Sequence, residues 1–182
     1  MSSETTLCPC RKLAIGFLLL ANAFADAAAI NVCEVVQHSE KYKNKVVTVT
    51  GEYLRGRHGA TIANEECGFQ SRYRPFGSGA AADVQYYDSS EKLPKEALAL
   101  VDQRSIQEFD EAIAKAIIDS KSAESIMAIT IVGLVRVADR YSIHESRDGS
   151  SLGTGYGFMG RYPVQIVILK IKKLQISGKA DR

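Results

Sequence analysis

Two stretches of the sequence alternate apolar and polar residues, and each has a glycine near its middle. The first, 45–55, contains Gly51, and the second, 127–137, contains Gly133, while a third run at 164–176 closes the chain. Alternation with a period of two predicts half-buried β-strands. Because a central glycine lets a long strand bend without a Cβ clash, this pattern indicates a small, strongly coiled antiparallel barrel.

Shorter patterns complete a fold of this kind. Segments 57–67 and 83–87 are predicted strands, the first of them joined to 45–55 by a tight turn. Segment 95–120 has apolar residues spaced like one face of an amphipathic helix. A helix inserted between strand pairs is the arrangement of the OB-fold, a five-stranded Greek-key barrel. We therefore predict a mainly β protein with inserted helices, built as a small OB-fold-like antiparallel β-barrel.

Local signals place a further helix and two loops. Asn31 and Glu34 have the Asn-x-x-Glu spacing of a capping box, which predicts a short helix that ends near residues 42–44. Residues 71–82 and 142–160 are rich in glycine and polar side chains, so we expect loops there.

The first 25 residues have the pattern of a secretory signal peptide. Arg11 and Lys12 precede 13 mostly apolar residues, and small residues surround Ala25. This run is shorter than the roughly 20 residues that a membrane span requires. We expect cleavage near Ala25, although the exact position stays open, and a periplasmic or secreted location. The mature chain, 26–182, is then a single domain without a stable membrane span.

Cysteine usage agrees with export. Cys8 and Cys10 lie in the predicted signal peptide, which leaves Cys33 and Cys67 in the mature chain. Two cysteines in an oxidising compartment favour one disulfide, so we expect Cys33 to pair with Cys67. Two free thiols or a metal pair are the alternatives. A structural zinc site needs four ligands, and the histidines are scattered, so no metal site is expected.

Basic and aromatic residues gather in two segments that the fold could bring together. The net charge of +2 is too small to indicate nucleic acid as a partner. OB-folds bind oligonucleotides or oligosaccharides with basic groups and stacking rings. For an exported protein we predict an anionic or carbohydrate ligand of the cell envelope, with ordinary solvated loops as the alternative. The predicted binding residues are Arg55, Arg57, Arg72, Tyr73, Arg74 and Phe76.

Two other motifs have simpler interpretations. His144 lies in a serine-rich loop, but no Gly-x-Ser-x-Gly elbow frames a serine, so a hydrolase that uses His144 is the weakest alternative. Gly155, Gly157 and Gly160 match a dinucleotide fingerprint, yet a loop precedes them and a strand follows, so no cofactor is expected. We expect a binding or structural module without catalytic residues. The stronger alternative is a protein–protein interaction module of the envelope that uses a barrel edge or the 142–160 loop.

Two segments resemble small secreted bacterial proteins of unknown function that have an OB-fold-like domain. The opening VCEVVQHSEKYKNKVVTVTGEY is similar to their cysteine-bearing helix and first strand, and GYGFMGRYPVQIVILKI is similar to their last loop and strand. The resemblance implies an OB-like fold and an envelope location, and it carries no catalytic residues. The matching residues are Tyr42, Lys45, Val47, Val49, Gly51, Gly157, Gly160, Tyr162 and Pro163.

Overall fold

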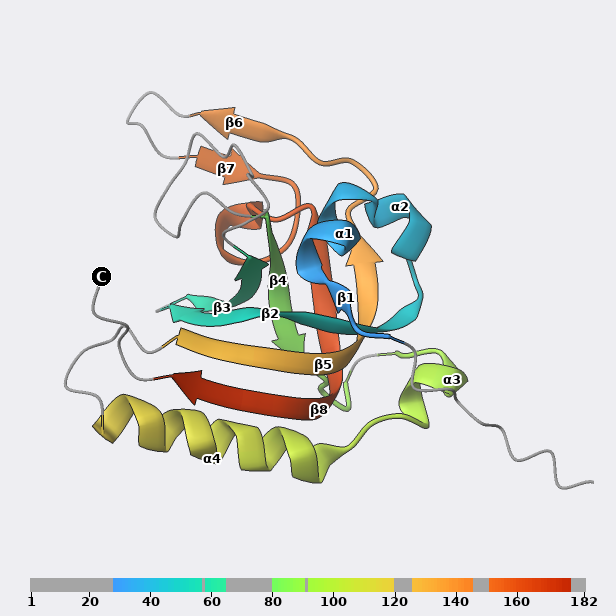
Figure 1. The fold of residues 1–182 in the computed structure, drawn as a ribbon. Helices are drawn as coiled ribbons and strands as arrows, with labels where there is room; N and C mark the ends of the chain where they lie inside the picture. Colours follow the sequence, from blue (N-terminus) through green and yellow to red (C-terminus); the bar gives the residue numbers. More distant parts are fainter. Residues whose placement is uncertain are drawn as a thin grey trace, which may run out of the picture.

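A computed structural model gives the protein a closed barrel with helices packed against it (Figure 1). The residues described are 28–56, 58–64, 80–90, 92–119, 126–145 and 151–177. The predicted signal peptide, residues 1–25, lies outside them. In this described part of the chain, no helix is long and apolar enough to cross a membrane.

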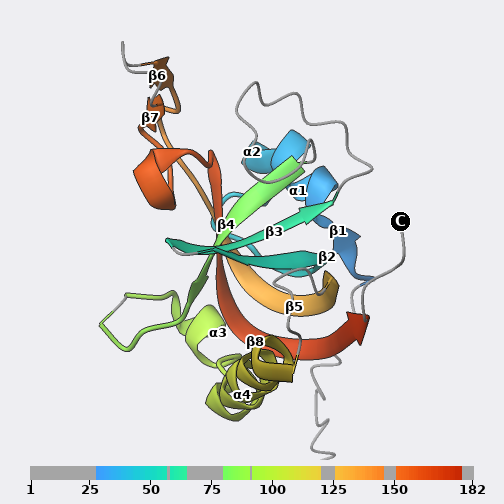
Figure 2. The ribbon, with the colours of Figure 1, turned by 90° about the vertical axis from the view of Figure 1, so that its left-hand side faces the viewer.

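Five strands form the wall of the barrel (Figures 1 and 2). They are β2 (Val46–Gly56), β3 (Gly59–Asn64), β4 (Ala80–Tyr86), β5 (Ile126–Val137) and β8 (Val164–Ser177). β2, β3 and β4 form an antiparallel meander, and β5 returns beside β2, which is a Greek-key connection. β8 pairs antiparallel with β5 and parallel with β4, so the ring closes. The prediction of a small OB-fold-like barrel is confirmed.

Gly51 and Gly133 each lie close against side chains of the neighbouring strand. A Cβ on Gly51 would stand 2.7 Å from Cγ1 of Ile62, and a Cβ on Gly133 would overlap Cγ2 of Ile166. Neither position has room for a side chain. The register of β5 against β8 also shifts twice near residues 130–133, and such bulges increase the bending of a strand.

The helix predicted over 95–120 consists of two helices in the structure. α3 (Lys95–Leu98) is followed by α4 (Gln103–Asp119). Asp102 lies between them, and its carboxylate accepts a 3.1 Å hydrogen bond from the N–H of Ser105. This is an N-cap, so the chain starts a new helix here instead of continuing the old one.

α4 contributes to the apolar core of the barrel. Ile106, Phe109 and Ile113 are buried in the same cluster as the inward side chains of the strands. The Phe109 ring meets the ring of Tyr53 edge to face, with centroids 5.1 Å apart, and lies 6.4 Å from the ring of Tyr86. The predicted apolar stripe therefore faces the core as expected.

Three short elements precede the barrel: β1 (Ile30–Asn31), α1 (Val32–Gln37) and α2 (Ser39–Tyr42). β1 pairs in parallel with β2, a pairing that two residues are too short to signal in the sequence. The single helix expected up to residues 42–44 is interrupted because His38 leaves the helical conformation, with φ −119° and ψ 40°.

The capping box at the start of α1 is only half formed. The side chain of Asn31 accepts a 3.0 Å hydrogen bond from the N–H of Cys33, so Asn31 is the predicted N-cap. The Glu34 carboxylate does not return to Asn31. It accepts bonds of 2.9 Å from Nζ of Lys41 and from the hydroxyl of Tyr42. Glu34 therefore joins α1 to α2, and these donors lower its pKa, the Lys41 bond most of all.

Candidate ligand-binding face beside β3 and β4

The connection from β5 to β8 is more ordered than the polar loop predicted for 142–160. It contains a two-stranded sheet of β6 (Ile143–Glu145) and β7 (Ser151–Gly153), then a 3₁₀ turn, η2 (Phe158–Gly160). β6 and β7 stand away from the barrel in both ribbon views (Figures 1 and 2). The prediction of an irregular loop is wrong here, because three-residue strands leave too short a pattern to recognise.

Residues 153–162, here called the glycine loop, fold back tightly on themselves. The N–H of Gly155 donates to the carbonyl of Gly160 at 2.9 Å, and Tyr156 and Tyr162 exchange backbone hydrogen bonds of 2.7 and 3.1 Å. A Cβ on Gly155 would overlap the carbonyl oxygen of Tyr162. Gly157 and Gly160 have φ of +70° and +64°, in the left-handed region. The Gly-x-Gly-x-x-Gly motif therefore serves close backbone packing, and β8 follows it where a dinucleotide site would need a helix.

The glycine loop presents an aromatic ring to the turn between β2 and β3. The side chain of Phe158 is 44% exposed, and its ring stacks on that of His58 with centroids 4.0 Å apart and an interplanar angle of 12°. The Arg161 guanidinium lies 6.0 Å from the Phe158 centroid. Two connections far apart in sequence thus meet at one end of the barrel.

Arg161 has hydrogen-bond donors without a strong acceptor. Its Nε is buried and has no partner, and its Nη2 is 3.5 Å from the sulfur of Met159, a weak acceptor. Among the residues that the structure describes, no carboxylate forms an ion pair with Arg161. The described carboxylates therefore leave the charge of the guanidinium uncompensated, although its buried Nε is not accessible to a ligand.

Beneath the glycine loop, polar side chains form a buried chain on the outer face of the barrel. Asp83 and Gln165 are each 7% exposed, and Nε2 of Gln165 donates to Oδ2 of Asp83 at 2.8 Å. Nη1 of Arg136 donates to Oε1 of Gln165 at 3.3 Å. Burial raises the pKa of Asp83, although the Gln165 bond opposes that shift.

Most of the predicted binding residues lie outside the described part of the chain. Arg55 is described: it is exposed near the end of β2, opposite Ala60, and close in sequence to His58. Five of the predicted binding residues are not described: Arg57, Arg72, Tyr73, Arg74 and Phe76. Their convergence with Arg55 stays a prediction. Phe158 and Arg161 were missed, because only the fold brings them to the turn that holds His58.

The predicted disulfide is described at one end only. Cys33 lies on α1 and is disulfide-bonded, but Cys67 is outside the described residues, so the Cys33–Cys67 pair stays a prediction.

The alternative site at His144 has one of the contacts that a hydrolase needs. Oγ of Ser142, the residue just before β6, lies 3.2 Å from Nε2 of His144. The same hydroxyl is 3.4 Å from Oγ1 of Thr154. Ser142 and His144 are both exposed on the projecting sheet. A serine and a histidine in contact do not by themselves make a nucleophilic site.

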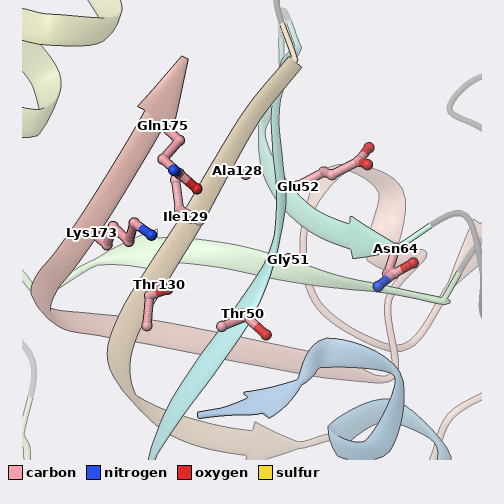
Figure 3. A pocket seen from close by; sticks show the side chains of 9 residues that line it. All are labelled: Thr50, Gly51, Glu52, Asn64, Ala128, Ile129, Thr130, Lys173 and Gln175. Carbon is pink, nitrogen blue, oxygen red and sulfur yellow. The ribbon is translucent and has the colours of Figure 1, made fainter. Parts of the chain in front are cut away.

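A polar hollow of about 370 Å³ opens on the outer face of β2, β5 and β8 (Figure 3). The register of the three strands explains it: Ala128 lies between Glu52 and Gln175, so a short side chain is flanked by longer ones. Lys173 and Thr130 border the hollow on the next row. Glu52 already has an interaction of its own.

Comparison with known proteins yields no match to a family model, to a curated protein or to a solved structure.

Proposed function

We propose that the protein is an exported, non-catalytic binding module that recognises an acidic carbohydrate of the cell envelope. The binding surface, here called the aromatic–arginine face, consists of His58, Phe158 and Arg161. The observation that carries the proposal is the Arg161 guanidinium, which lies beside an exposed, stacked Phe158 ring without a carboxylate partner in the described residues.

The chemistry of this surface matches a ring that bears an anion. A guanidinium presents five N–H donors in a planar fork, which suits the two oxygens of a carboxylate. The exposed part of the Phe158 side chain offers an apolar contact for a sugar ring. Arg55, which is exposed near the end of β2 and close in sequence to His58, adds a positive charge near the same turn.

The proposed location comes from the sequence. Residues 1–25 have the signal-peptide pattern, and the disulfide-bonded state of Cys33 suits an oxidising compartment. We also propose kinship with the small secreted bacterial proteins that the first and last segments resemble.

Calorimetric titration with two probes tests the proposal. The acidic probe is an oligogalacturonide, and the neutral probe is the methyl ester of the same oligosaccharide, which has the same rings without the charge. We expect the acidic form to bind at least about tenfold more tightly, since a hydrogen bond to a charged group contributes about 1.5–3 kcal/mol. Arg161→Gln should remove that preference, and Phe158→Ala should weaken both probes. Binding to the acidic probe should also weaken as salt is added.

Arg104→Gln is the matched control, because Arg104 is an exposed arginine on α4 that pairs with Glu108. Its binding should equal that of the unmodified protein. Equal affinity for the two probes, no binding of either, or full affinity in Arg161→Gln would each overturn the proposal.

A second candidate function, a protein–protein interaction module, rests on the projecting β6–β7 sheet. Leu152 is 52% exposed and Ile143 is 40% exposed, and the pairing of β6 with β7 puts them on opposite faces. Capture of an envelope protein that persists in high salt and is lost in Leu152→Ser would favour this function, because apolar contacts are insensitive to ionic screening.

A further inference from the structure

Asp83 is a carboxylate placed where a charge is costly. It lies on the outer face of β4, yet it is only 7% exposed because the glycine loop covers it. Its direct side-chain partner is the neutral amide of Gln165, at 2.8 Å. A buried ion without an opposite charge in contact is unfavourable, so the environment favours the neutral acid.

The glycine loop lies directly on this carboxylate. A Cβ on Gly157 would stand 2.6 Å from Oδ1 of Asp83 and 2.8 Å from Cδ2 of Tyr162. The loop therefore lies close to Asp83, and a side chain at position 157 would meet the carboxylate and would also need the left-handed φ of +70°.

Charged and titratable groups face Asp83 from several elements, and none of those described neutralises it directly. From β5, Arg136 reaches it only through Gln165, and Arg136 has a further interaction of its own. From the loop, the Tyr162 phenol is half-buried, and both desolvation and the charge of Asp83 raise its pKa, so Tyr162 stays neutral. The charge of Arg161 lowers the pKa of Tyr162, but Arg161 does not contribute to the pKa of Asp83. β3 contributes the neutral Thr61 opposite Asp83.

We propose that Asp83 is an acid-responsive clasp for the glycine loop: the neutral acid holds the loop against β4, and ionisation loosens it. The loop carries Phe158 and Arg161, so the clasp would regulate the proposed binding face, and in this respect the inference rests on the proposed function. Loop docking itself depends only on the contacts around Asp83.

The direction of the pH effect follows from burial. The pKa of Asp83 is raised while the loop is docked, and opening the loop hydrates the carboxylate and returns its pKa toward the ordinary value of 3.8. Docking is therefore firmest below that value and weakens as pH rises through the docked-state pKa. The opening constant changes up to about tenfold for each unit by which the two pKa values differ.

Amide hydrogen exchange measures the clasp without any ligand. The reporters are the N–H groups of Gly155, Tyr156 and Tyr162, followed from pH 4 to pH 8 as protection factors corrected for intrinsic exchange. We expect protection to fall as pH rises in the unmodified protein. In Asp83→Asn, which is neutral at every pH, protection should stay high and flat.

The exposed Asp88 provides the matched control, so Asp88→Asn should retain the pH dependence of the unmodified protein. A carbon-13 titration of the Asp83 carboxyl in the unmodified protein should have its midpoint where protection falls, and this measurement needs no variant. Protection that is flat with pH, or that falls equally in Asp83→Asn, would overturn the clasp. Because no sugar is present, this outcome is independent of whether the carbohydrate proposal holds.

Discussion

The glycine loop offers a sharp test of close packing in Gly155→Ala. The added methyl group would overlap the carbonyl oxygen of Tyr162 and stand 3.0 Å from that of Gly160. Real Cβ atoms do not come closer than about 3.0 Å to such atoms, and both obstacles are backbone. The two sides of the loop must therefore separate, and no side-chain rearrangement can relieve the clash.

The expected loss can be estimated from the bonds that the separation breaks. The N–H of Gly155 donates to Gly160 at 2.9 Å, and that of Tyr156 donates to Tyr162 at 2.7 Å. At about 0.5–1.5 kcal/mol net for each hydrogen bond, the docked loop loses roughly 1–3 kcal/mol relative to the open loop. No residue of the loop belongs to the described apolar clusters, so the free energy of global unfolding should change much less.

Nuclear magnetic resonance separates the two effects. Stacking on Phe158 should shift the ring protons of His58 upfield, and Gly155→Ala should remove that shift and the amide protection of the loop while the core amides of β5 and β8 stay protected. Leu152→Ala, in the neighbouring exposed strand, should leave both signals intact. If Gly155→Ala retains the His58 shift and the loop protection, the argument from backbone approach is wrong.

Three further predictions concern the barrel and its charges. Phe109→Ala should lower the free energy of unfolding by about 3–5 kcal/mol in chemical denaturation, as expected for a buried phenylalanine, whereas a loss below about 1 kcal/mol would show that α4 does not complete the core. Gln165→Ala should destabilise the protein by about 1–3 kcal/mol in the same assay, because it removes the side-chain amide that bonds Asp83; a neutral outcome would mean that water replaces it. Stability should also fall when pH drops below about 4.5, since three exposed carboxylates have a lowered pKa in the folded state and lose that stabilisation on protonation, which an acid titration by circular dichroism would detect. Those carboxylates belong to Glu34, Asp102 and Asp139.

The barrel could be predicted from the sequence because its signals are local and repeated. Apolar and polar residues alternate along the whole strand around Gly51 and along the whole strand around Gly133. Both glycines face inward, where a side chain has no room. The boundary between α3 and α4 was missed, although Asp102 and Ser105 form an N-cap that the sequence contains. Amphipathic spacing simply continues across that break and conceals it.

The sequence predicts the chemical character of the candidate site but not the residues that form it. A basic and aromatic surface near the β2–β3 turn was expected, and Arg55 lies there, but the ring that stacks on His58 comes from Phe158 in a distant connection. No periodic pattern reports such a contact, because it depends on how the closed barrel places the ends of its strands. The lack of a described partner for Nε of Arg161 is likewise a property of the folded chain alone.

A loop this rich in glycine would ordinarily be a poor place to build a binding surface, since glycine has the most conformational freedom to lose. Here the same residues permit a backbone ladder that fixes the loop before a ligand arrives. Phe158 and Arg161 are then presented from a position already ordered, which reduces the entropy lost on binding. The buried Asp83 works against this order, because its ionised form favours the open loop. A surface that is fixed by glycines and loosened by one carboxylate can be both preorganised and adjustable, and substitutions at Gly155 and at Asp83 should shift the opening of the loop in opposite directions.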